Sequence, residues 1–279
     1  MLRVLGEPVD VVTGVTQLHN VVYLVCDEFS SILRFNATTH QRLENIKVNN
    51  LSSPRDIAAC EQTSRLYVAD SVGIWGVSAD GADTKRWWPK SSTDTFKPWT
   101  VSVMSTRLLV MSLDTKQLMQ LDADGNELRR VQLPDYMKPY DAVESPTGTF
   151  IVSHGNTQER QLRVVSEVNT DGEVLRQFSS GPVKFGELLH VAVDSRANIL
   201  VADSGNRHIL LLSVLDSKQA KQLKLRRVIV DEHQLHDDRM VMELLDKDKQ
   251  PKRLCYVERT GQLLVGFWRS VAVFDVLRR

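Results

Sequence analysis

The sequence predicts an all-β fold, a six-bladed β-propeller built from four-stranded antiparallel blades. The first observation is that residues 190–212 hold three short apolar runs separated by two polar turns, the pattern of a three-stranded meander. The second is that this pattern recurs in six copies, whose first strands begin near Asp10, Asp56, Thr100, Asp141, Val191 and Leu254. The third is the interval between copies, about 40 to 60 residues, which is the length of a propeller blade.

A fourth strand completes each of the first five copies. These strands are predicted at residues 42–48, 84–88, 127–133, 173–178 and 225–230, where apolar and basic residues alternate irregularly, as is typical of an outer edge strand. Gly81, Gly125 and Gly172 lie in the turns before three of them, and each follows an Asp. Asp-Gly pairs favour tight hairpins, because glycine adopts positive φ without steric cost.

The sixth copy lacks a fourth strand of its own. The sequence ends soon after the apolar run at 271–274, and residues 1–5 resemble the outer strand at 225–230. We therefore expect residues 1–5 to pair with the last blade and close the ring.

The composition indicates one domain that spans residues 1–279. The chain is 42% hydrophobic, and its 35 basic residues balance its 35 acidic residues, so no overall charge favours nucleic acid or a membrane. Three cysteines, an odd number, lie inside predicted strands, which is typical of a reducing compartment. No run is long enough to cross a membrane, and Glu7 and Asp10 interrupt the stretch where a signal peptide would be apolar. We expect a cytoplasmic protein with no membrane partner.

One connection, residues 231–251, is about twice as long as most of the others. Its apolar residues Met240, Val241, Leu244 and Leu245 have the spacing of a short amphipathic helix. His233 and His236 lie in the same stretch, without a further ligand motif. Two alternatives stay open for this insertion, a lid that contacts a partner and a surface loop without a function.

Residues 54–70 and 190–204 carry the unit in which this chain resembles the NHL-repeat family. The second copy continues through Asp203–Ile209, Asp-Ser-Gly-Asn-Arg-His-Ile, which is close to the most characteristic segment of that family. The resemblance implies a six-bladed propeller that binds a protein partner or single-stranded RNA. NHL domains often end tripartite-motif proteins, but this sequence has no RING, B-box or coiled-coil region, so ligase activity is not expected.

In a propeller, the links that enter the first strands and the links between second and third strands emerge on the same face. The first set supplies Arg55, Lys97, Trp99, Lys138, Tyr140 and Arg253, and the second supplies Phe29, His154, Arg207, Trp268 and Arg269. Basic groups interleaved with aromatic rings can clamp a peptide or stack bases, so these are the candidate partner-binding residues. Trp268 and Arg269 are the strongest candidates. Trp99 and Tyr140, each directly after a proline, have packing in the fold as the alternative.

The alternative function is a metal-dependent hydrolase or lyase, similar to six-bladed lactonases or amidating lyases. Asp27, Asp70 and Asp203 occupy the same slot after the second strand and could hold a divalent cation. A short acid in such a slot more often accepts N–H groups of its own turn. His154, His190 and His208 are the zinc candidates. The common catalytic and nucleotide-binding motifs are absent, so we expect no enzyme activity and no cofactor.

Overall fold

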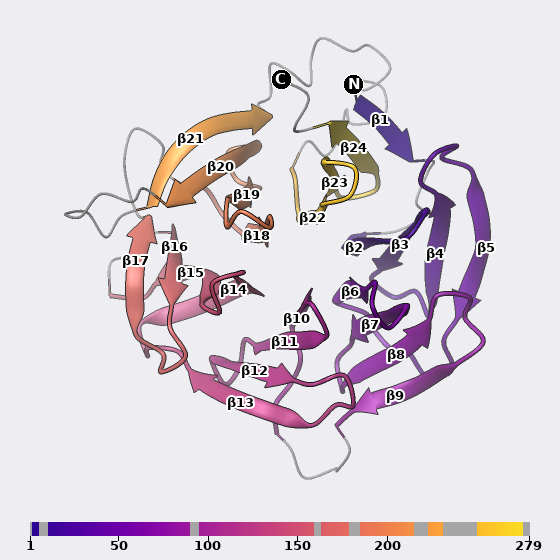
Figure 1. The fold of residues 1–279 in the computed structure, drawn as a ribbon, viewed down its shortest axis with the longest axis horizontal. Helices are drawn as coiled ribbons and strands as arrows, with labels where there is room; N and C mark the ends of the chain where they lie inside the picture. Colours follow the sequence, from indigo (N-terminus) through magenta and orange to yellow (C-terminus); the bar gives the residue numbers. More distant parts are fainter. Residues whose placement is uncertain are drawn as a thin grey trace.

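The computed structural model describes residues 2–5, 11–89, 95–158, 163–178, 185–214, 223–230 and 250–275. These residues form six four-stranded antiparallel sheets that surround a central axis like blades, which confirms the predicted propeller (Figure 1). No helix within these ranges is long and apolar enough to cross a membrane. The insertion predicted at 231–251, with its expected helix and His233 and His236, lies outside the described residues except for its last two positions.

Each of the first five blades uses four consecutive strands, with the first nearest the axis and the fourth at the rim (Figure 1). Blade 1 holds β2 (Val12–Leu18), β3 (Val21–Cys26), β4 (Ser31–Asn36) and β5 (Arg42–Lys47). Blade 2 holds β6 (Asp56–Cys60), β7 (Arg65–Ala69), β8 (Ile74–Ser78) and β9 (Thr84–Trp88). Blade 3 holds β10 (Thr100–Met104), β11 (Arg107–Ser112), β12 (Gln117–Leu121) and β13 (Glu127–Gln132). Blade 4 holds β14 (Met137–Glu144), β15 (Phe150–Asn156), β16 (Arg163–Val168) and β17 (Val174–Phe178). Blade 5 holds β18 (Leu189–Val193), β19 (Ile199–Asp203), β20 (His208–Val214) and β21 (Leu223–Val230).

Blade 6 closes the ring with strands from both ends of the sequence. It holds β22 (Arg253–Val257), β23 (Gln262–Gly266), β24 (Val271–Asp275) and β1 (Leu2–Leu5). β1 pairs antiparallel with β24, with Leu2 opposite Phe274 and Leu5 opposite Val271. The predicted closure by residues 1–5 is therefore confirmed.

The hydrophobic core is divided into six clusters, and each cluster lies between two neighbouring blades. Because each strand presents apolar side chains to both sides of its sheet, every blade contributes to the cluster before it and the cluster after it. The three Asp-Gly turns have the expected backbone, with φ of +82° at Gly81, +80° at Gly125 and +86° at Gly172.

Candidate functional site

A pocket of about 250 Å³, here called the face pocket, lies at the end of the propeller where the first strands begin. Four blades supply its walls, through links that enter first strands and links between second and third strands. The lining residues are Trp99, Leu113, Lys138, Tyr140, Leu188, Leu189, His190, Ser204, Lys252 and Arg253. Four of them, Trp99, Lys138, Tyr140 and Arg253, are among the residues that the sequence proposed for partner binding.

Three aromatic rings on this face carry a cation. The guanidinium of Arg55 lies 4.7 Å from the centre of the Trp99 ring, and that of Arg163 lies 5.3 Å from the centre of the Tyr140 ring. The ammonium of Lys252 lies 3.3 Å from the centre of the Trp268 ring. Such pairs contribute about 0.5–2 kcal/mol each and fix both partners in place. Arg55 and Trp99 were both predicted as contact residues, whereas the cations on Tyr140 and Trp268 come from Arg163 and Lys252, which were not.

Arg253 lies between the face pocket and the central channel, and its guanidinium is held by backbone oxygens of three blades. It donates from Nε to the Thr13 carbonyl, from Nη1 to the Lys252 carbonyl at 2.9 Å and from Nη2 to the Arg55 carbonyl at 3.3 Å. The neighbouring segment is also fixed, because Ser204 Oγ donates to the Pro251 carbonyl at 2.5 Å. Lys252 and Arg253 thus have a defined position before any ligand binds.

The other predicted contact residues lie outside the face pocket. Arg269 and Arg207 are exposed, and Trp268 and Arg55 are half-buried in their cation–ring pairs. Lys97 is exposed, with its Nζ 3.4 Å from Asp114 Oδ2. Phe29 is half-buried and packs on the core between blades 6 and 1, so its ring contributes to the fold.

His154 is a correction to the sequence prediction. Its side chain is 0% exposed, with Nε2 2.8 Å from Ser166 Oγ and Nδ1 3.2 Å from the Gly155 carbonyl. Burial lowers the pKa of His154 to about 4, so the ring is neutral near pH 7. A fully buried ring cannot touch a partner, and His154 is removed from the candidate contacts.

The aspartates of the possible cation slot accept backbone N–H groups of their own turns and, for Asp203, of the link before β18. Asp70 accepts the N–H groups of Val72 and Gly73, each at 2.8 Å, and the indole N–H of Trp75 at 2.7 Å. Asp203 accepts the N–H groups of Gly186 at 3.0 Å and Asn206 at 3.2 Å. Asp27 is exposed and accepts the N–H of Glu28. The turn alternative raised from the sequence explains these three residues.

A different trio, Asp56, Asp141 and His190, is the group among the described residues whose ligand atoms lie within 4.8 Å of one another. All three side chains are buried and lie in first strands, Asp56 in β6, Asp141 in β14 and His190 in β18. Burial raises the pKa of Asp56 to about 7, an effect that Arg253 opposes and Asp141 reinforces. The trio was missed from the sequence, although Asp56 and Asp141 stand at the same first-strand slot two residues after a proline.

The trio belongs to a set of hydrogen bonds, here called the inter-blade ring, that joins every blade to the next around the axis. Its donors and acceptors come from the first strands and the links that lead into them. In blade order the bonds run from Thr13 Oγ1 to the Pro54 carbonyl, Val101 N to Asp56 Oδ2, Ser102 Oγ to the Ala142 carbonyl, Val191 N to Asp141 Oδ2, Leu254 N to His190 Nδ1 and Arg253 Nε to the Thr13 carbonyl. The buried acids and His190 therefore have a structural role.

The protonation of His190 follows from this ring. Its Nδ1 accepts the Leu254 N–H at 3.2 Å, so the neutral imidazole carries its proton on Nε2, which lies 3.3 Å from Asp141 Oδ2. Burial lowers the pKa of His190 to about 4; Asp141 acts in the opposite direction and Arg253 in the same direction. Neither ring nitrogen then has a free lone pair for a metal ion or for a substrate proton.

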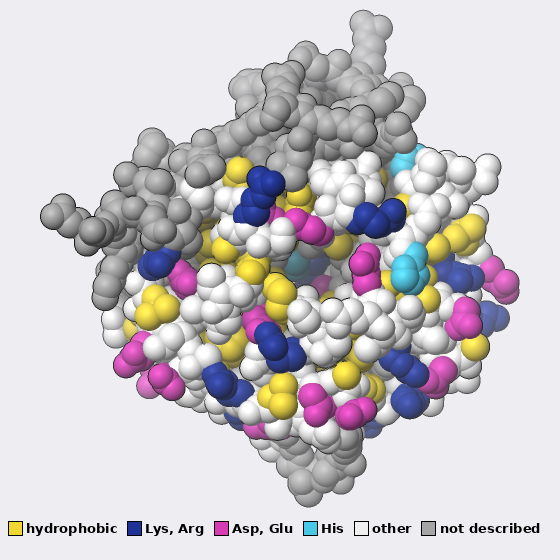
Figure 2. Space-filling view, in the orientation of Figure 1, with side chains coloured by type: hydrophobic (Ala, Val, Ile, Leu, Met, Phe, Trp, Pro, Cys, Tyr) yellow, Lys and Arg dark blue, Asp and Glu magenta, His cyan; other side chains and the backbone are white. Residues whose placement is uncertain are grey.

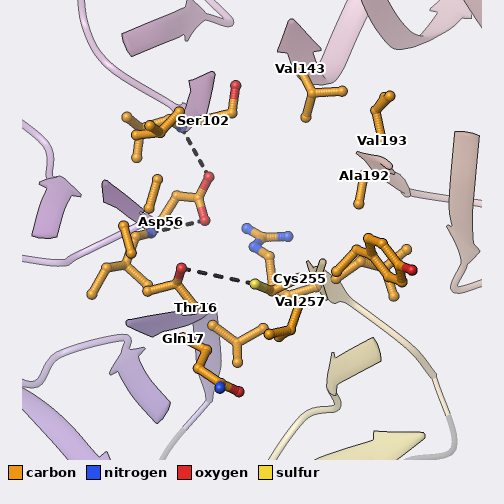
Figure 3. A pocket seen from close by; sticks show the side chains of 18 of the residues that line it. Thr16, Gln17, Asp56, Ser102, Val143, Ala192, Val193, Cys255 and Val257 are labelled. Carbon is orange, nitrogen blue, oxygen red and sulfur yellow. Dashed lines mark hydrogen bonds between the residues drawn. The ribbon is translucent and has the colours of Figure 1, made fainter. Parts of the chain in front are cut away.

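The central channel, a cavity of about 280 Å³, runs along the first strands on the other side of Arg253 and His190. Figure 3 shows Asp56, Ser102, Val143, Ala192 and Cys255 around this space, and two hydrogen bonds hold the Asp56 carboxylate. Figure 2 shows a hollow at the centre of the face turned to the viewer, with acidic and basic side chains interspersed around it. The face of the propeller that Figure 2 turns to the viewer therefore has no continuous basic surface.

Sequence reasoning missed five residues that line the face pocket, Leu113, Leu188, Leu189, Ser204 and Lys252. Lys252 adjoins Arg253, which was predicted, and Leu188 directly precedes Leu189, the first residue of β18. Leu188 is 56% exposed, whereas Leu189 is buried. A pair of bulky apolar residues at the start of a first strand was the available signal, since only one of the two side chains can enter the core.

No protein-family model matches the chain, and no curated protein matches it. Solved structures share the fold. The WD40 β-propeller domain of Doa1 is 13% identical, with a TM-score of 0.63 over 99% of this chain and 96% of that chain. Virginiamycin B lyase from Staphylococcus aureus is 8% identical, with a TM-score of 0.64 over 98% of each chain. A chain of a nidogen/laminin complex is 15% identical, with a TM-score of 0.60 over 81% of this chain and 82% of that chain. At these identities the similarity establishes a β-propeller and leaves the function to the site.

Proposed function

We propose that this chain is a non-catalytic recognition module of the NHL type that binds a segment of a protein partner on the face that carries the face pocket. The observation that supports this proposal most is the pocket itself, to which four blades contribute and whose walls include four of the predicted contact residues. Aromatic and arginine side chains at a shared pocket are the groups that dominate binding energy in protein interfaces.

Two further observations support the proposal. The NHL-like unit at 54–70 and 190–209 implies binding of protein or single-stranded RNA, and one structural neighbour comes from a complex of two proteins. Cys26, Cys60 and Cys255 form no disulfide among the described residues, which supports a reducing, cytoplasmic setting. RNA is the subsidiary ligand.

The proposed binding face is tested by variants of Trp268 and Arg269, which lie in the link between β23 and β24. Proteins captured from a cell extract by the wild-type chain are purified and bound again one at a time, which separates direct partners from passengers. The double variant Trp268→Ala with Arg269→Glu should lose direct binding, whereas Leu128→Asn on the outer strand β13 should keep it. Equal binding by both variants, with unchanged thermal stability, would contradict the assignment of this face.

The second candidate function is a metal-dependent hydrolase or lyase. The observation in its favour is the trio Asp56, Asp141 and His190, together with the similarity in fold to a lyase. The hydrogen bonds of the trio oppose it, because His190 uses Nδ1 as an acceptor and Asp56 accepts two backbone N–H groups. Elemental analysis of purified protein and thermal unfolding with added calcium, magnesium or zinc decide between the two. Stoichiometric metal that Asp141→Asn removes would favour the enzyme.

A further inference from the structure

The face pocket has a charge that the chain as a whole does not have. Among the described residues, its walls include Lys138, Lys252 and Arg253 and no carboxylate, although acidic and basic residues are equal in number over the sequence. Leu113, Leu188 and Leu189 with Trp99 and Tyr140 provide apolar surface beside these cations. Complementary charge speeds the approach of a ligand and excludes ligands of the wrong sign.

From this arrangement we infer that the partner segment is acidic, with one bulky apolar side chain in the face pocket and carboxylates beside it at Lys138, Lys252 and Arg253. This inference rests on the proposed function and specifies its ligand. The volume of about 250 Å³ is below the range of roughly 300–1,000 Å³ usual for drug-sized ligands, so it suits a single large side chain.

Arg253 is prepared for a carboxylate by its contacts in the fold. Its guanidinium donates to three neutral carbonyl oxygens, and a guanidinium has five N–H groups. Because these bonds already fix the side chain, an added carboxylate meets a cation that loses little rotamer entropy on binding. Asp56 lies on the channel side of Arg253 and is not part of the pocket wall.

Leu188 is an exposed apolar residue in the wall of the face pocket. It is a large apolar residue with φ of +40°, and its side chain is 56% exposed. A left-handed backbone at a residue other than glycine costs about 1–2 kcal/mol, and strained residues of this kind are concentrated at binding sites. A bulky side chain of the ligand would cover Leu188 and remove it from water.

The experiment is selection of a random-peptide display library on the immobilised chain, followed by sequencing of the bound peptides. We expect Asp and Glu next to Leu, Ile, Phe or Trp to be enriched over the starting library. Two variants have matched controls at exposed positions away from the pocket. Leu188→Asn, which suits the left-handed backbone, is compared with Leu128→Asn, and Lys138→Glu is compared with Lys47→Glu.

We expect selected peptides, once synthesised, to bind at least about tenfold more weakly to Leu188→Asn and to Lys138→Glu, and to bind both controls as they bind wild type. Enrichment of basic or uncharged peptides that still depend on Leu188 would overturn the inference and leave the proposed function standing. Enrichment of no peptide would overturn both. Tight binding of a single-stranded oligouridylate that Lys138→Glu abolishes would replace the peptide with RNA.

Discussion

The central channel and the face pocket share His190 and Arg253 as walls but differ in charge. Among the residues that the structure describes, the channel is lined by five acids, Asp56, Glu61, Asp141, Glu144 and Glu258, against Arg253 and Arg259. The described walls of the face pocket have three basic residues and no acid. At the channel, Asp56, Asp141 and His190 are buried and bonded to backbone N–H groups of the next blade. Charged residues that look catalytic by type can thus be structural, and the exposed basic and apolar groups nearby are those left for a ligand.

Arg253→Met should have the largest effect, because this residue serves both regions. Its loss leaves three carbonyl oxygens without a donor and removes the cation beside Asp56, which we expect to cost about 3 kcal/mol. For a domain of this size that corresponds to a fall in Tm of roughly 5 °C, measured by calorimetry. Arg269→Met is the control, since an exposed arginine should change stability by no more than about 0.5 kcal/mol. Equal Tm values for the two variants would show that the inter-blade ring contributes little.

Asp56→Asn should change the pH dependence of stability. The pKa of Asp56 is raised from 3.8 to about 7 in the folded chain, so its contribution is present at low pH and is lost as pH rises toward 7. His190 and His154 have pKa values lowered from 6.5 to about 4, so their contribution is lost as pH falls toward 4. The wild type and Asp56→Asn both contain these histidines, so the difference between their free energies of unfolding reports the titration of Asp56 alone.

We expect the free energy of unfolding of the wild type to fall relative to Asp56→Asn by about 1 kcal/mol per pH unit between pH 4.5 and 6.5. Urea unfolding at several pH values measures it. Parallel pH profiles would mean that Asp56 titrates near its ordinary range and that the channel end is well solvated.

Salt should weaken peptide binding at the face pocket and leave the stability conferred by the inter-blade ring nearly unchanged, so it distinguishes the two regions without a mutation. Binding of an acidic peptide to the face pocket depends on exposed charges, so raising the ionic strength from about 0.05 to 0.5 M should weaken it about tenfold. The urea midpoint should move little, because the inter-blade ring is shielded from ions. If the affinity does not change with salt, the apolar contact and not the charges contributes most of the binding free energy.

Leu188→Gly should have the smallest effect on stability and a clear effect on binding. Glycine removes the strain of φ +40° but increases the freedom of the unfolded chain, so the free energy of unfolding should change by no more than about 0.5 kcal/mol. Peptide affinity should fall, because the exposed apolar surface is gone. A large loss of stability would instead assign Leu188 to the core.

The fold was accessible from the sequence because each blade repeats the same local pattern. Alternating apolar runs predict strands, and the Asp-Gly turns at 81, 125 and 172 predict the last hairpin of three blades, so six copies gave the architecture. The match between residues 1–5 and the outer strand at 225–230 predicted β1, since a ring without an edge needs a fourth strand in blade 6.

The site was only partly accessible. The rule that two sets of links share one face placed Trp99, Lys138, Tyr140 and Arg253 correctly together, but it cannot say which side chain points inward. His154 was misjudged for this reason: it was assigned to a link, but β15 continues to Asn156, so His154 lies within the strand with its side chain buried. Asp56, Asp141 and His190 meet only when three blades are brought around one axis, and no spacing in a single sequence reports that distance.

The pairing of β1 with β24 affects the order in which the six sheets can form during synthesis. During synthesis β1 leaves the ribosome long before its partner β24 at Val271–Asp275. Each of the other five sheets is built from contiguous sequence, whereas the sixth joins strands that are far apart in the sequence. We therefore expect the sixth sheet to form last, and a chain shortened before β24 to leave β1 without a strand to pair with.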